Sequence, residues 1–183
     1  MIRLLKHVIT AGIIATAMLF PASAQAAPPA GVSPAVVISA AARQLTRMDA
    51  ELVPVHLAVK DWWSAVRSSL SLVDTLSYRL STEVLLGKGE EALMALIAAT
   101  DALTESIDAL DAAARAGIDV LDAFPPAACF ADYWAVERVA FRLIGDSVES
   151  LRIGDMASAN AQIGHGLYLF QVQAELERSI AVC

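Results

Sequence analysis

An apolar stripe between Leu93 and Leu121 constrains the fold of this chain more than any other feature of its sequence. Its members recur at alternating intervals of three and four residues, which puts them on one face of a helix and matches the seam of a helix bundle. The stripe consists of Leu93, Leu96, Thr100, Leu103, Ile107, Leu110, Ala114, Gly117 and Leu121. It therefore predicts a long helix that packs against other helices.

A second apolar series with the same spacing precedes it, from Ala41 to Leu80. Ser33-Pro34 is typical of a helix start, with a capping serine followed by proline at the first helical position. The phase of the series is kept across Pro54. Because proline removes one helical hydrogen bond and clashes with the preceding turn, we expect a break or kink near 51–53. The segment is then either two helices roughly in line or one kinked helix.

Three short motifs divide the rest of the chain. Gly87-Lys88-Gly89 indicates a tight reversal, and Phe124-Pro125-Pro126 ends the helix that follows it. Ile153-Gly154-Asp155 turns the chain between two further helices, with Asp155 as the N-cap. No period-two strand pattern occurs in the sequence. Long seams with short connections predict an all-α, antiparallel up-and-down bundle of four to five long helices.

The N-terminus has the three regions of a secretory signal peptide. A basic start is followed by the apolar run Val8 to Phe20 and by small-residue cleavage points after Ala24 and Ala26. The run is shorter than the roughly 20 apolar residues that cross a bilayer. We therefore expect a cleaved signal peptide over 1–26, a flexible leader over 27–33 and one bundle domain over 34–183. Such a protein is secreted or periplasmic.

The charge of the mature chain excludes some classes of partner. Cleavage would remove Arg3 and Lys6 and leave 11 basic residues against 20 acidic ones. Nucleic-acid phosphates and anionic lipids are both bound by clusters of Lys and Arg. We therefore expect no nucleic-acid partner, and no membrane association after the signal has been cleaved.

Two cysteines, Cys129 and Cys183, are most simply one disulfide in an exported chain. They would lie at the open end of the terminal hairpin and close a loop that the chain-entropy model values at about 4 kcal/mol. A Cys-x-x-Cys pair or a nearby histidine pair, as a redox or zinc site needs, is absent from the sequence.

Acidic residues give little sign of a catalytic or metal site. The series from Asp101 to Asp122 lies off the apolar stripe, and the sequence has no Glu-x-x-His motif, so we interpret it as a solvated face without a metal. Glu137 falls within the apolar series of its helix, where we expect a polar inter-helix contact opposite 171–175 or a position at the bundle edge. No second catalytic group can be named, so we expect no enzyme.

His165 stands between Gly164 and Gly166, and glycines within a helix require a reason. Pairing the two cysteines aligns these glycines with Gly145, which predicts close helix packing. The alternative is a non-covalent haem with His165 as one axial ligand and Met48 or His56 as the other. Close packing is the hypothesis we prefer, so we predict no cofactor.

Trp62 and Trp63 are adjacent, so on a helix they point about 100° apart and only one can be central to a seam. Either the second lies at a groove edge, or the aromatic pair contacts a partner or ligand. Together these features favour a protein that acts by binding, either to a partner protein or to an apolar small molecule. The oligomeric state is left open by the sequence.

Overall fold

The computed structural model describes residues 34–180. The predicted signal peptide (1–26), the leader (27–33) and Cys183 lie outside this range, so the cleavage and the disulfide stay predictions. Cys129 is in the short helix η1.

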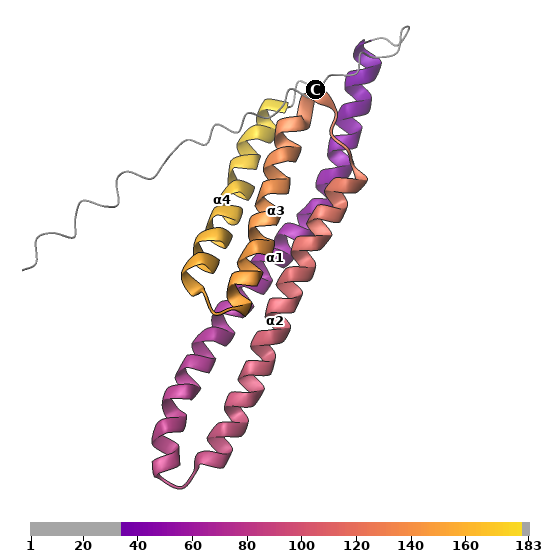
Figure 1. Cartoon of the computed structure of the whole chain (residues 1–183). Coiled ribbons are helices and arrows are strands. Elements are labelled where there is room, and N and C mark those ends of the chain that lie inside the picture. Colours follow the sequence, from indigo (N-terminus) through magenta and orange to yellow (C-terminus); the bar gives the residue numbers. More distant parts are fainter. Residues whose placement is uncertain (1–33, 181–183) are drawn as a thin grey trace, which may run out of the picture. The chain divides into compact units, whose positions relative to one another are not determined.

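Within residues 34–180 the chain forms four α-helices that pack as an up-and-down bundle (Figure 1). They are α1 (Pro34–Leu85), α2 (Gly89–Ala123), α3 (Ala131–Arg152) and α4 (Met156–Ile180), with the 3-10 helix η1 (Ala128–Phe130) before α3. Each helix packs against the next one along the chain. None of the helices in this range has the length and apolarity needed to cross a membrane.

Helix α1 continues through Pro54, which leaves the bundle with four long helices instead of five. Of the two alternatives that the sequence left open for 51–53, the structure has the single helix. Proline costs an interior helix about 3 kcal/mol, but Leu52 and Val59 on either side of it are both buried in the same core. Packing of both halves against common neighbours therefore holds the helix together where the local signal favours an interruption.

The three predicted ends are confirmed. Gly87 and Gly154 both have positive φ (74° and 79°), a conformation that glycine adopts without strain. At the second turn, the backbone N–H of Ser158 donates to Asp155 Oδ1 at 3.1 Å, so Asp155 caps α4. At the third end, helix α2 stops at Ala123, directly before Phe124-Pro125-Pro126. Local turn chemistry therefore sets where these helices begin and end.

The core is drawn from all four helices and from η1. Its most deeply buried side chains are Met48, Leu52, Val59, Val66, Leu110, Leu121, Phe130, Phe141, Ile144, Val148 and Ile163. Gly117 of α2 is part of this packing, because a Cβ at that position would overlap the ring of Phe141. The absence of a side chain there lets α2 and α3 approach closely.

The glycines around His165 are only partly explained by packing. A Cβ on Gly166 would lie 3.0 Å from the carbonyl oxygen of Ala140 and 3.0 Å from Ile144 of α3, so close approach is confirmed at that position. A Cβ on Gly145 or Gly164 would meet no atom within 4 Å. The packing hypothesis is wrong for those two, because they lie off the line where α3 and α4 touch.

Candidate functional site

A cluster of polar side chains lies inside the bundle, between α1 and α3. Helix α3 carries Tyr133 and Glu137 one turn apart on its inward face, and α1 carries Asp49 and His56 two turns apart. A hydrogen bond joins His56 Nε2 to Glu137 Oε2 at 3.1 Å, and the Tyr133 hydroxyl donates to Asp49 Oδ1 at 2.6 Å. Two polar contacts therefore tie the first helix of the bundle to the third.

Aromatic rings enclose the His56–Glu137 pair. The His56 imidazole stacks on Phe141 of α3, with ring centroids 5.5 Å apart and an interplanar angle of 21°. On its other side it contacts Phe170 of α4 at 4.2 Å. The side chain of Glu137 is 0 % exposed. The carboxyl group of Glu137 is therefore closed off from solvent, whereas the imidazole, at 19 % exposure, still reaches it at one edge.

Burial changes the acidity of both carboxyl groups. Removal from water raises the pKa of Glu137 above its usual value, against the opposing effects of the hydrogen bond to His56 and of the charge on its imidazole. The neighbouring Asp49 also raises the pKa of Glu137. Burial likewise raises the pKa of Asp49, opposed by its hydrogen bond from Tyr133. The cluster thus favours protonated carboxyl groups more than water does.

The second oxygen of Glu137 and the amide of Gln173 are the remaining polar groups here. Among the residues that the structure describes, neither Glu137 Oε1 nor Gln173 Nε2 has a hydrogen-bond partner. Because α3 and α4 are antiparallel and Gly166 meets Ala140 and Ile144, Gln173 lies opposite Tyr133 and Glu137. One is an acceptor and the other a donor, so each lacks the kind of partner that the other would supply.

Sequence reasoning found Glu137 but not its partner. The hydrogen bond of Glu137 to another helix goes to His56 of α1, while Gln173, within the expected stretch 171–175, lies opposite it on α4. His56 had been considered only as a haem ligand. A histidine beside the apolar series of α1 was the available signal, but pairing two residues 81 positions apart needs the tertiary fold.

The second candidate is a surface. In Figure 1 the hairpin of α1 and α2 continues past the turn that joins α3 to α4. We call residues 72–105 of this hairpin, with its loop, the hairpin end. Within that range only Ala99 is buried. Large apolar side chains here are open to solvent: Leu72, Tyr78, Val84, Leu85, Leu86, Leu93, Met94 and Ile97.

The residues predicted as haem ligands lie in different surroundings. His165 is exposed on α4, whereas Met48 of α1 is fully buried in the core. His56, the other candidate, is engaged with Glu137. No contact in the described part of the chain favours the haem hypothesis over packing.

The tryptophan pair divides as expected, with one member in the core. Trp63 is buried and Trp62 is 41 % exposed, so Trp62 is the one that a partner could reach. A hollow on the outer surface of α1 is lined by Ser64, Arg67, Ser68 and Ser71, with a volume of about 480 Å³. Within residues 34–180 no group of three or more His, Cys, Asp or Glu is placed to hold a metal ion.

Comparison with known proteins gives no family or relative. No family model, no curated protein sequence and no solved structure matches the chain. Function must therefore be argued from the site and the surface.

Proposed function

We propose that this chain is an exported, non-enzymatic helical-bundle protein that acts by binding a partner protein, and that the partner packs on the hairpin end. One observation carries the proposal: the apolar stripe of α2 is longer than the cover that α3 and α4 provide. Leu110 in that stripe is fully buried, whereas Leu93 is 46 % exposed and nearby Ile97 is 45 % exposed.

Exposed apolar side chains that gather on one part of a surface mark interaction sites more often than singly scattered ones do. The hairpin end fits this description, because its apolar residues come from both helices and from the loop between them. Leu85 beside the turn is 85 % exposed and Met94 is 62 % exposed. Covering such groups removes apolar area from water, which is the main favourable term in protein association.

A partner protein fits better than the apolar small molecule that the sequence left as an alternative. Small-molecule sites are concave and lined mostly by apolar and aromatic side chains. The hollow on α1 is instead lined by serines and an arginine. The hairpin end has two adjacent helices of exposed apolar groups, which suits a partner that supplies another helix.

The buried polar cluster supports the non-enzymatic part of the proposal. A general acid or base must come within hydrogen-bond reach of its substrate. Glu137 has the raised pKa of a candidate acid, but its side chain is 0 % exposed and one of its oxygens is already bonded to His56. The cluster therefore fits a role in fixing the register of α1 against α3 and α4.

The test compares three immobilised proteins in an extract of the source organism's exported fraction. They are the wild type, a hairpin-end variant (Leu93→Ser, Met94→Ser, Ile97→Ser) and a control that changes three similarly exposed residues of the body, by which we mean the bundle outside the hairpin end (Val53→Ser, Leu57→Ser, Tyr168→Ser). We expect quantitative mass spectrometry to find a protein enriched on the wild type and the control but lost from the hairpin-end variant. Equal enrichment on all three would remove the hairpin end from the account.

A further inference from the structure

We infer that the segment docking on the hairpin end is a basic amphipathic helix, lying along α2 as a continuation of the position that α3 occupies. The inference rests on the proposed binding function and names the chemistry of the partner. It rests on the exposed apolar residues of α2, on the acidic residues that follow them and on the ion pairs that α3 makes with the next acidic residues of α2.

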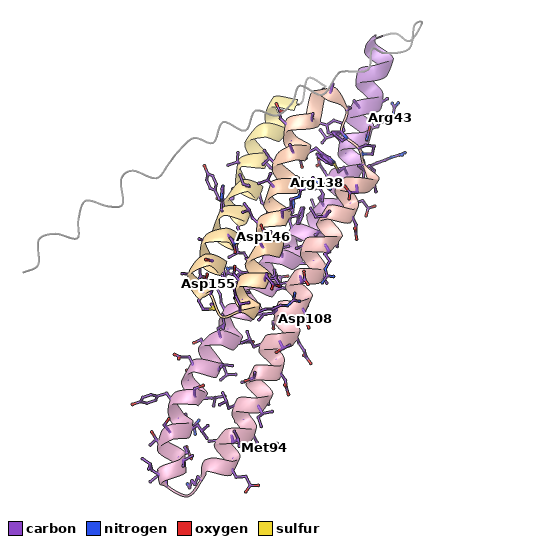
Figure 2. The ribbon with its side chains drawn as sticks, viewed as in Figure 1. Arg43, Met94, Asp108, Arg138, Asp146 and Asp155 are labelled. Atoms are coloured by element: carbon purple, nitrogen blue, oxygen red, sulfur yellow. The ribbon has the colours of Figure 1, made fainter. Side chains whose placement is uncertain are left out.

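One face of α2 changes along its length from apolar to acidic. Met94, Ile97, Asp101, Glu105 and Asp108 follow one another at intervals of three or four residues, so they form a single stripe on the helix surface. The first four are exposed and belong to the hairpin end. Figure 2 labels Met94 near the end of the hairpin and Asp108 near the α3–α4 turn.

Helix α3 contacts this stripe at Asp108, outside the hairpin end. Its last residue, Arg152, donates to Asp108 Oδ1 and to Asp111 Oδ2, at 3.0 Å each. The basic end of one helix is therefore seated on the acidic face of another. Further along the stripe, Asp101 and Glu105 form no ion pair with any residue that the structure describes.

Charge selects among possible occupants of the surface. The hairpin end has six acidic residues against two basic ones, a net charge of −4. One of the two cations, Arg79, is already paired with Glu83. A second copy of the chain would bring the same negative charge and be repelled, whereas Lys or Arg on an incoming helix would be attracted.

Length agrees with a helical occupant. From Leu93 to Glu105 helix α2 spans about 18 Å at 1.5 Å per residue, the length of about three helical turns. A helix of that size with apolar residues at i, i+3, i+4 and i+7 can place them against Leu93, Met94 and Ile97. Its basic residues then lie beside Asp101 and Glu105, which is the helix-docking mode of recognition.

The probe is a labelled 16-residue peptide of leucine and lysine, with leucines at helical spacing, followed by fluorescence anisotropy. We expect saturable one-to-one binding to the wild-type chain, weakened by added salt. Affinity should fall about tenfold for Asp101→Asn/Glu105→Gln and for the hairpin-end variant. The matched control, Asp119→Asn/Asp146→Asn, removes two exposed acidic charges from the body and should keep affinity within about twofold.

Three results would overturn the inference. One is no saturable binding, and another is an equal loss for the control pair, which means attraction by net charge alone. The third is a wild-type dimer in analytical ultracentrifugation that the hairpin-end variant abolishes, because a second copy then occupies the surface. The proposed function fails separately, since it requires only that partner capture depend on the hairpin end.

Discussion

The four-helix body and the hairpin end are built from the same two helices, yet they differ in what covers them. In the body, α3 and α4 lie over α1 and α2, and the apolar stripe is buried at Leu110 and Leu121. In the hairpin end the stripe continues in phase, but its member Leu93 is exposed, as is Ile97 beside it. Periodicity therefore shows which face of a helix is apolar, and the length of the neighbouring helices decides whether that face is covered.

The largest expected difference is in local stability, measured by native-state hydrogen exchange. Regions with few buried contacts open with free energies well below that of global unfolding. We expect amides of residues 72–105 to exchange about a thousandfold faster than amides of 45–66, although both are helical. Equal protection at low protein concentration, where a dimer would dissociate, would contradict the comparison.

A matched pair of truncations on α2 tests the same difference in packing. Leu110 is 0 % exposed, so Leu110→Ala should cost about 2–5 kcal/mol of unfolding free energy through lost burial and a cavity. Leu93→Ala, one stripe position in the hairpin end, should cost about 0.5 kcal/mol or less. Urea denaturation of both variants gives the two values. Similar costs would show that the hairpin end is packed as tightly as the body.

Two glycines of the body differ in how closely they are packed. Gly117→Ala should lower the unfolding free energy by about 1–3 kcal/mol, because its Cβ overlaps Phe141. Gly164→Ala should raise it by up to about 1 kcal/mol, because alanine is the better helix former and its Cβ meets no atom within 4 Å. Thermal melts of the two variants should therefore shift in opposite directions. A stabilising Gly117→Ala would show that α2 and α3 are less close than described.

The smallest effect concerns pH and the polar cluster of the body. The pKa of Glu137 is raised in the fold, so its contribution to stability is present below the ordinary value of 4.5 and is lost as pH rises through the raised pKa. The difference in unfolding free energy between wild type and Glu137→Gln should fall with rising pH, by at most about 1.4 kcal/mol per pH unit. Asp49 acts in the same direction.

Asp155 provides a control of opposite sign. Its hydrogen bonds from Ser158 lower the pKa of this capping carboxyl group, so its contribution is present above the ordinary value of 3.8 and is lost as pH falls. Denaturation series of Glu137→Gln and Asp155→Asn should therefore diverge from wild type in opposite pH ranges. A flat difference for Glu137→Gln would place that carboxyl group in contact with water.

Several features could be predicted from sequence because neighbouring residues control them. The reversal at Gly87, the turn at Gly154 and the cap at Asp155 each depend on the conformation or hydrogen bonding of a few adjacent residues. At Pro54 the same local reasoning left two helices or one kinked helix open, and the structure has one helix. There, packing on both sides of the proline outweighed one missing hydrogen bond.

Only one residue of the buried polar pair could be predicted from the sequence. Glu137 was recognisable as a polar residue in an apolar series, but His56 could not be identified as its partner from spacing along the chain. The hairpin end was hidden for a related reason. The stripe of α2 was visible in full, but where α3 would stop covering it depends on how the helices align.

The sequence by itself determined that the chain is helical, which faces are apolar and where the turns fall, because these follow from contacts within a few residues. Only the tertiary structure decided that α1 is one helix and that His56 bonds to Glu137. It also decided that the α1–α2 hairpin extends beyond the part on which α3 and α4 pack. Those outcomes depend on packing between segments far apart in the chain. Whether a side chain on one helix is buried depends on the length and register of the helix that packs against it.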